Sequence, residues 1–468
     1  MTKETLDILI KIAYLISAIL FIVGIKRMQK TSEARGGNFL SAVGMAIAII
    51  ATLIQVDVLT LPEIFISALI GSAIGWIYAQ KVEMTQMPEM VALFNGFGGL
   101  ASLFVAMSDF YLKQVEMNIE PDTVTITAIV LSLLIGGVTF TGSMVAWGKL
   151  NGKINGNSVV FTGQHLVNLV LFLVTLTAGA LLIYDYTSTN MLWLIAIVSL
   201  VLGVLVVIPI GGADMPVVIS LLNSYSGMAG CATGFVLGNY MLIVAGALVG
   251  ASGIILTNIM CKAMNRSLVS VLLGGFGTTT SSATGGAKGS EMVVKEVGIE
   301  EAAMIFDSAS SVIVVPGYGM AVAQAQHIIK ELMELLEKKN INVRFAIHPV
   351  AGRMPGHMNV LLAESNVPYD KLIEMDNIND DFANTDVVIV VGANDVVNPA
   401  ARTNTSSPIY GMPILNVDKA RTVIVSKRSM ASGYAGIENE LFGFPNCLML
   451  FGDAKASLTK VVGELKDM

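Results

Sequence analysis

The chain has 468 residues, of which 54% are hydrophobic and only 13% are charged, and its mean hydropathy is +0.71. Such a composition excludes an ordinary soluble enzyme of this size and indicates a membrane protein. The net charge of −7, with no basic run, argues against a nucleic-acid partner, and three cysteines make no disulfide framework.

The apolar residues are concentrated in residues 1–262, which we expect to form an all-α bundle in the lipid bilayer. A membrane-spanning helix needs about 20 mostly apolar residues. About nine segments qualify, although residues 209–213 separate the seventh from the eighth only weakly. The segments are about 5–25, 38–54, 63–80, 87–107, 123–148, 166–184, 191–209, 214–236 and 239–261.

The cations between these spans are distributed unequally. If the N-terminus lies outside, the outer loops hold only Lys113, with Lys3 on the tail. The positive-inside rule therefore predicts an outer N-terminus and an inner, cytoplasmic soluble domain. The cations on the inner side are Lys26, Arg27, Lys30, Arg35, Lys81, Lys149, Lys153, Lys262 and Arg266.

Polar residues within apolar spans are functional candidates, because burying them in a membrane is costly. Asp214 stands near a helix start, where it either caps the helix or serves a function. Asn223, with Ser226, and Asn95 lie in the middle of two spans, and His165 only begins one. A proton path here would need Asn, Ser and water, or a His from another chain.

Glycines crowd several spans, at 71–75, 96–99, 136–142 and 246–253. Small residues at these spacings let helices pack closely. The alternative is a lining narrow enough to exclude ions.

Residues 263–290 are predicted to be a flexible linker, because 274–287 is a Gly/Ser/Thr run without an apolar period. It either lets the following domain, residues 291–468, move relative to the bundle or is a passive spacer.

That domain begins with the motif of a dinucleotide-binding turn. The β-branched run 311–315 ends in Pro316-Gly317-Tyr318-Gly319, and a helical pattern extends from Ala321 to Leu336. A strand, a glycine turn and a helix in this order let backbone N–H groups approach a pyrophosphate. Val322 replaces the usual third Gly or Ala, so an ordinary βα turn is the alternative.

The second strand, 342–347, ends in His348-Pro349 and lacks the acidic residue that holds the ribose in NAD sites. A later strand, 422–425, leads into Ser426-Lys427-Arg428-Ser429. Two cations beside hydroxyls suit the 2′-phosphate of NADP, although they could be solvated charges at a strand end.

The remaining pattern predicts an α/β Rossmann-like domain with a doubly wound parallel sheet of about six strands. Residues 386–391, 413–417 and 447–451 complete the sheet. Ligands of such sheets bind at the carboxyl ends of the strands, here beside the loops 350–357, 392–399 and 452–455.

No Ser/His/Asp set, metal-ligand cluster or phosphate-binding P-loop is present, so we predict no catalytic side chain and no metal. A nicotinamide carries hydride chemistry itself. A single nicotinamide site joined to a membrane bundle suggests that another chain delivers the hydride partner.

Several stretches resemble one family over essentially the full length of the chain: the β subunit of proton-translocating NAD(P) transhydrogenase. The matching stretches are 211–218, 222–227, 261–267, 316–326, 348–364, 392–395, 427–429, 433–435 and 452–455.

The resemblance implies an NADP(H) site in this domain, with Lys427 and Arg428 at the 2′-phosphate. It also implies that NADP lies in reversed orientation, which competes with the pyrophosphate assignment to Gly317 and Gly319. The implied cofactor-binding residues are Gly317, Tyr318, Gly319, Val350, Ala351, Gly352, Arg353, Met354, Pro355, Gly392, Ala393, Asn394, Asp395, Val396, Gly411, Met412, Lys427, Arg428, Ser429, Met430, Ala431, Ser432, Gly433, Tyr434, Asp453 and Ala454.

The resemblance further implies an α subunit that carries the NAD(H) site and further membrane helices, a dimer of the α–β unit, and a multi-pass location in the inner membrane. Hydride would pass directly between the nicotinamides, coupled to proton translocation. Asp214, Asn223 and Arg266 are similar to residues of the proton pathway, and we add Asn95, which stands where many members have a His.

Two other functions remain open from the sequence. A transporter or channel gated by nucleotide binding would also combine a bundle, a linker and a Rossmann-like sensor domain. A structural membrane anchor is the third option, which NADP binding by residues 291–468 would argue against.

Overall fold

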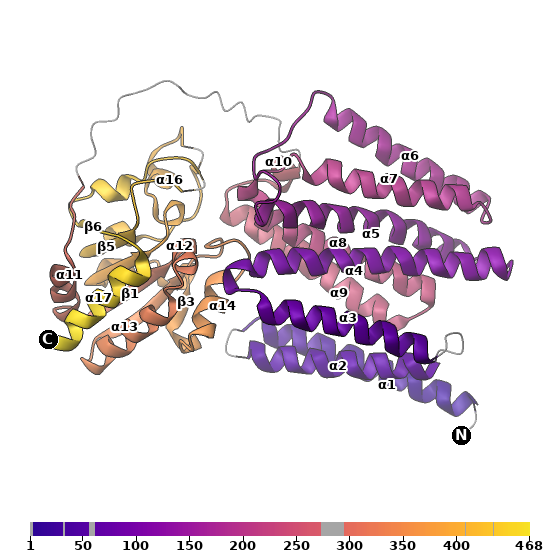
Figure 1. The fold of residues 1–468 in the computed structure, drawn as a ribbon, viewed down its shortest axis with the longest axis horizontal. Coiled ribbons are helices and arrows are strands. Elements are labelled where there is room, and N and C mark those ends of the chain that lie inside the picture. Colours follow the sequence, from indigo (N-terminus) through magenta and orange to yellow (C-terminus); the bar gives the residue numbers. More distant parts are fainter. Residues whose placement is uncertain (1–2, 31–32, 56–60, 273–293, 408, 434) are drawn as a thin grey trace. The chain divides into compact units, whose positions relative to one another are not determined.

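The computed structural model describes residues 3–30, 33–55, 61–272, 294–407, 409–433 and 435–468 (Figure 1). The chain divides into two compact units, Met1–Thr257 with Val271–Gly275 and Asn258–Ser270 with Phe276–Met468. Of the predicted linker, 263–290, the short helix α10 (Leu268–Leu272) is described, whereas the Gly/Ser/Thr run 274–287 lies outside the described residues.

Nine helices of at least 19 residues occur in the described residues up to Ala263, one for each predicted span, which confirms the helical bundle. Eight of the described helices are long and apolar enough to cross a membrane. Helix α8 falls short because Asn223, Ser224, Tyr225 and Ser226 interrupt its apolar sequence, yet most of its residues are buried. The bounds are α1 (Lys3–Met28), α2 (Ala34–Gln55), α3 (Leu61–Lys81), α4 (Met87–Phe110), α5 (Thr123–Leu150), α6 (Gln164–Tyr184), α7 (Thr189–Val207), α8 (Met215–Leu237) and α9 (Tyr240–Ala263).

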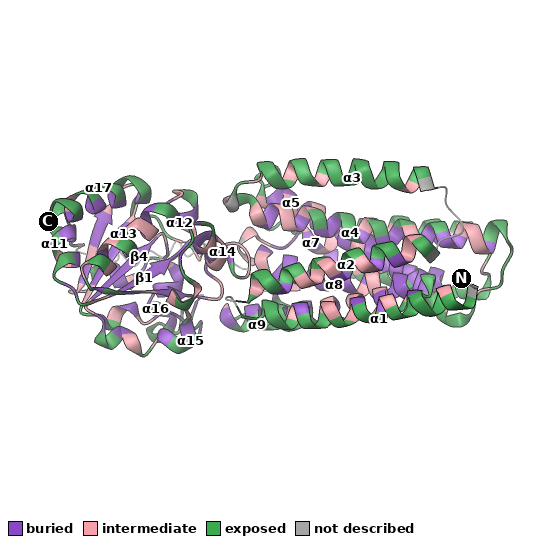
Figure 2. Ribbon diagram, turned by 90° about the horizontal axis from the view of Figure 1, so that it is seen from below, coloured by how far each residue is buried: buried purple, intermediate pink, exposed green. Residues whose placement is uncertain are grey.

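Close helix packing, one of the two interpretations of the glycines, is found between α4 and α5. A Cβ on Gly99 would lie 2.8 Å from the Gly136 carbonyl oxygen, and one on Gly136 would lie 2.6 Å from that of Gly99. Only glycine permits this approach. Helix α3 differs, because Gly71 and Gly75 have open space beside them, and Figure 2 shows α3 exposed along its length.

The second unit contains the expected doubly wound parallel sheet. Its order is β3-β2-β1-β4-β5-β6, so the chain direction across the sheet reverses between β1 and β4. Strands β1 and β4 are almost completely buried, which explains their continuous apolar sequences. The strands are β1 (Ser311–Pro316), β2 (Asn342–Ile347), β3 (Leu372–Glu374), β4 (Val387–Val391), β5 (Thr422–Lys427) and β6 (Cys447–Phe451).

Helices cover both faces of this sheet. Figure 2 shows α11 (Ile299–Asp307), α13 (Gln326–Lys338) and α17 (Ala454–Asp467) on one side. The short helices α15 (Met375–Ile378) and α16 (Ala400–Thr403) lie on the other side. This two-sided cover is what a parallel sheet requires to bury its faces.

Three details of the sequence interpretation were wrong. Residues 413–417 form no strand, because Leu415 N–H donates to the Val396 carbonyl and the Asn379 amide donates to the Ile414 carbonyl, both outside the sheet. The third strand is instead β3, whose three residues are too few for a detectable pattern. The single helix expected over 321–336 is broken at Gln324, which has φ +51°, into α12 (Tyr318–Val322) and α13.

Candidate functional site

Most of the predicted cofactor residues meet at one edge of the sheet. Strands β1, β2, β4, β5 and β6 are parallel, so the segments that follow them leave from the same edge. These segments contain residues 317–319, 348–355, 392–396, 428–433 and 453–454. Gly411 and Met412 lie on the loop after α16, where Gly411 N–H donates to the Ala401 carbonyl at 2.8 Å. Tyr434 lies outside the described residues.

The loops after β1 and β4 touch through their backbones. A Cβ on Gly317 would lie 2.4 Å from the Gly392 carbonyl oxygen, and one on Gly392 would lie 2.4 Å from Gly319 Cα. The N–H groups of Gly317 and Gly319 donate to the carbonyls of Val391 and Gly392, both at 2.9 Å. Because these two amides already have protein acceptors, the glycines are explained by loop contact without a pyrophosphate.

A buried histidine organises the loop after β2. His348 Nδ1 accepts the Val350 N–H at 3.2 Å, so its Nε2 carries the proton and donates to the Pro413 carbonyl at 2.9 Å. Burial lowers the pKa of His348 to about 4, against smaller opposing effects of the Pro413 bond and the Asp376 charge. The ring is therefore neutral near pH 7 and joins this loop to the segment after Met412.

The same loop is joined to the loop after β1. Arg353 N–H donates to His357 Nδ1 at 3.0 Å, and the Arg353 guanidinium lies 4.4 Å from the centre of the Tyr318 ring. Gly352 has φ +103°, and a Cβ there would lie 2.6 Å from His357 Nδ1. These contacts fix a cation and an aromatic ring beside the β1 turn.

Asp395 connects the loops after β4 and β5. Its carboxylate is buried, and its Oδ2 accepts the Ala435 N–H at 3.1 Å. A Cβ on Gly433 would lie 2.5 Å from both carboxylate oxygens, so only glycine leaves room for them. The acid therefore holds the far end of the 427–433 segment against the sheet edge.

Lys427 occupies the start of that segment and is half-buried. Its Nζ donates to the Ala431 carbonyl and lies 5.0 Å from the centre of the Phe442 ring. Burial lowers the pKa of Lys427, whereas the charge of Asp395 raises it. Residues 428–432 are exposed, so Arg428 and its neighbours are accessible to an anion.

Two buried polar atoms at this edge fit a polar ligand. Asn439 donates to the carbonyl and to Oδ1 of Asn394, at 2.9 and 3.1 Å, so the Asn394 amide is oriented with Nδ2 directed elsewhere. Within the described ranges, Asn394 Nδ2 and Ser426 Oγ are buried and have no hydrogen-bond partner. Buried polar atoms are normally paired, so these atoms at the ends of β4 and β5 suit a bound phosphate or amide.

Comparison with known proteins identifies the family. The family described as NAD(P) transhydrogenase beta subunit matches residues 10–464. The chain belongs to this family. Two sequences from Rhodospirillum rubrum, each called NAD(P) transhydrogenase subunit beta, are 50% identical to it over 453 residues. The alignment covers 96% of this chain and 97% of each relative.

As a transhydrogenase beta subunit, the chain belongs to an oxidoreductase family whose name implies an α partner and the use of NAD(P). Its helical unit is the membrane part. Of the residues predicted for the proton pathway, Asp214 and Asn223 belong to α8, Asn95 belongs to α4, and Arg266 follows α9. Asp214 is the N-cap of α8, but its side chain makes no capping hydrogen bond, which weakens the cap interpretation. Asn223 is an exposed residue of α8, and Arg266 is exposed beyond the end of α9.

Asn95 is buried within α4, and its Nδ2 donates to Ser143 Oγ of α5 at 3.0 Å. In the part of the chain that the structure describes, Asn95 Oδ1 is a buried acceptor without a hydrogen bond. The side chain therefore has capacity for a further donor.

Lys149 was predicted as a loop cation, which is wrong, since it lies in the last turn of α5 and is 5% exposed. Its ammonium donates to the carbonyls of Asn157, Ile208 and Ile210, at 3.1, 2.6 and 2.7 Å. It therefore joins α5 to the segment between α7 and Asp214. The sequence could not reveal this role, because the three acceptors are backbone atoms of distant residues.

Proposed function

We propose that this chain binds NADP(H) at the carboxyl edge of its sheet and exchanges hydride with NAD(H) held by the α partner, coupled to proton translocation. The observation that carries the proposal is the convergence of five strand-end loops around unpaired buried polar atoms and accessible cations. When bound, the nicotinamide would supply the hydride chemistry.

The residues of this edge have separable tasks. Arg428, with Lys427 released from the Ala431 carbonyl, would hold the 2′-phosphate by charge-assisted hydrogen bonds. The donor Asn394 Nδ2 and the hydroxyl of Ser426 would bind polar groups of the dinucleotide. The remaining predicted residues would line the site, and Tyr434 stays a prediction outside the described residues.

The membrane unit would carry the protons. Asp214, Asn223, Asn95 and Arg266 are the proposed pathway groups, and Asn95 offers a free acceptor oxygen rather than a titratable ring. The titratable group in this part of the membrane would therefore come from a partner chain, or water would serve. The proposed arrangement is an inner-membrane dimer of the α–β unit, with the N-terminus outside and the α/β domain in the cytoplasm.

The proposal is tested with the complete α–β complex sealed in vesicles, supplied with NADPH and an NAD analogue whose reduced form absorbs at its own wavelength. Reduction of the analogue and a simultaneous change of internal pH are expected. Absence of hydride transfer would reject the oxidoreductase function and leave nucleotide-gated transport as the alternative. Transfer without a pH change would reject only the coupling to protons.

A further inference from the structure

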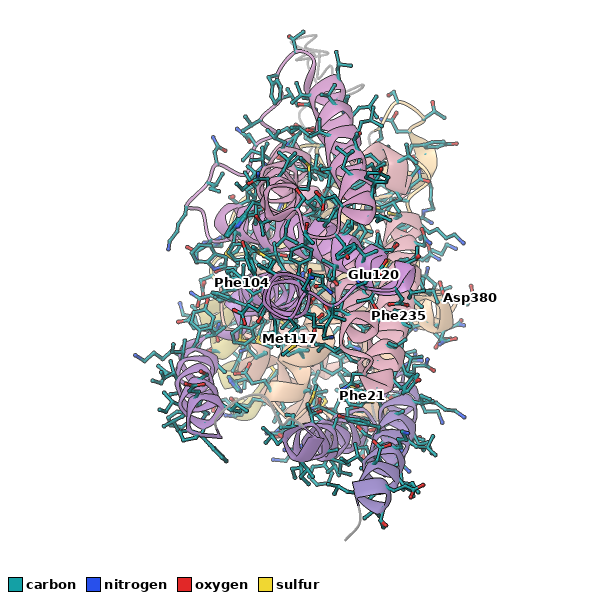
Figure 3. All side chains as sticks on the ribbon, turned by 90° about the vertical axis from the view of Figure 1, so that its right-hand side faces the viewer. Phe21, Phe104, Met117, Glu120, Phe235 and Asp380 are labelled. Carbon is teal, nitrogen blue, oxygen red and sulfur yellow. The ribbon has the colours of Figure 1, made fainter. Side chains whose placement is uncertain are left out.

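Helix α4 carries three polar residues on one face, at a spacing of seven residues. They are Asn95, Ser102 and Asp109, and each is only 8% exposed. Seven residues are close to two full helical turns, so the three side chains follow one line along the helix, about 10.5 Å apart. Phe104, labelled in Figure 3, is 57% exposed and belongs to another side of α4.

Hydroxyl groups of two neighbouring helices meet this line. Ser143 of α5 accepts the hydrogen bond from Asn95, as described above. Ser102 Oγ donates to the Gly98 carbonyl at 3.2 Å, and a Cβ on Gly98 would lie 3.0 Å from Ser226 Oγ of α8. The polar groups are therefore concentrated where α4, α5 and α8 meet.

Asp109 ends the line just before the π-helical turn Tyr111–Glu116. Its Oδ1 accepts from Lys113 Nζ at 2.7 Å. Among the described residues, its Oδ2 is buried without a hydrogen bond, and so is Oε1 of Gln114, which is almost completely buried. Acceptors of this kind normally bind a proton donor, which indicates a water or a proton beside Asp109.

A simple surface ion pair does not account for Asp109. The same four-residue spacing joins Asp7 to Lys11 on α1, where the side chains are 53% and 65% exposed. The Asp109 side chain is 8% exposed, whereas that of Lys113 is 37% exposed. One carboxylate oxygen is thus turned into the bundle while the other faces a lysine that reaches solvent.

Asp109 lies two residues before Tyr111, whose aromatic contact suits a membrane boundary. Trp193 Nε1 donates to Tyr111 Oη at 2.7 Å, and such aromatic pairs mark the interface level. The opposite end of α4 holds Glu89, which accepts from Asn151 at the end of α5. The contacts of Lys149 place the segment before Asp214 at that same opposite end.

We propose that Asp109 is the terminal proton-relay group of a pathway limb that runs along the α4 line from Asn95 through Ser102. The inference rests on the proposed proton translocation and adds residues for the part of the proton pathway beyond Asn95. The Asp109 carboxylate accepts one proton from a hydronium ion at its end of the bundle and passes it, through Oδ2, to a water beside Ser102. The Ser102 hydroxyl accepts one proton from that water and donates its own proton to the next water toward Asn95. Charge and atoms therefore balance, and no electron moves. About three waters would bridge each gap at ordinary hydrogen-bond distances.

The experiment uses the complete α–β complex in vesicles and measures proton uptake and hydride transfer together. Asp109→Asn is expected to reduce both at least tenfold with unchanged NADP affinity and intact assembly, and Asp109→Glu to restore most of the rate. Ser102→Ala is expected to slow uptake, whereas Ser108→Ala, one residue from Asp109 and exposed, is not. Glu120→Gln, an exposed carboxylate on the segment between α4 and α5 (labelled in Figure 3), is the matched acidic control.

Lys113→Met separates a relay from a structural ion pair. A relay needs only the carboxylate, so this variant is expected to keep most of the proton uptake. Equal losses in Asp109→Asn and Lys113→Met would overturn the inference, as would an Asp109→Asn complex that pumps at the native rate. If the unmodified complex moves hydride without protons, the proposed coupling fails and the relay fails with it.

Discussion

The contact between the loops after β1 and β4 is tested by replacing Gly392 with alanine. The added Cβ would lie 2.4 to 2.5 Å from Gly319 Cα, Gly319 C and Met320 N, and it would meet a backbone of φ +66°. All three atoms belong to main chain, so no side chain can move aside. The two loops must separate by about 1 Å to restore ordinary contact distances near 3.5 Å.

Gly436 provides a matched control. It also has a positive φ, +70°, but nothing lies within 4 Å of its added Cβ. Gly436→Ala therefore carries only the left-handed backbone penalty, about 1–2 kcal/mol. Gly392→Ala carries that penalty and an overpacking cost of about 1–3 kcal/mol. The difference between the two variants is the overpacking cost of placing a Cβ between the two loops.

Calorimetry of the purified full-length chain in detergent measures this difference as a shift of the α/β-domain melting endotherm. At about 2–4 °C per kcal/mol for a domain of this size, Gly392→Ala should melt about 2–12 °C below Gly436→Ala. NADP affinity should fall with it, because the loop after β4 lines the proposed site. If Gly392→Ala melts no lower than Gly436→Ala, the backbone contact is not a constraint and the explanation of these glycines is incorrect.

Three further predictions concern charge. Lys427→Ala with Arg428→Ala should weaken NADP binding to the full-length chain by about 10- to 100-fold per lost charge-assisted bond and leave NAD binding nearly unchanged in titrations; equal losses for both nucleotides would contradict the 2′-phosphate assignment. Asp214→Asn should reduce proton uptake by the complex in vesicles more than it reduces NADP affinity, and native uptake would make Asp214 a structural residue. His348 has a pKa lowered from 6.5 to about 4, so its contribution to the free energy of unfolding is complete above pH 6.5 and is lost as pH falls toward 4; the loss is about 3.5 kcal/mol at about 1.4 kcal/mol per pKa unit. The melting temperature of His348→Gln should therefore depend less on pH between 6.5 and 4.5 than that of the native chain; parallel curves would mean that folding does not lower the pKa of His348.

The nine helices and most strands could be read from the sequence because their signals are local. A run of about 20 apolar residues is sufficient for a membrane helix, and α8 was recognised although its polar residues lower its hydropathy. Continuous apolar strands such as β4 follow from burial on both faces. The segment 413–417 has the same composition, yet its partners are loops rather than strands, and this depends on distant residues.

The chain's composition and motifs were enough to predict its class, a membrane part followed by an α/β domain, and candidate residues at the sheet edge, since each prediction depends on neighbours in sequence. The fold alone revealed that Gly317 and Gly392 touch, that Lys149 binds three carbonyls, and that one Asp109 oxygen is buried without a hydrogen bond from any described residue. Such facts depend on which backbone atoms meet across long sequence separations. Tertiary packing determines these contacts, and no local pattern of residue types encodes them.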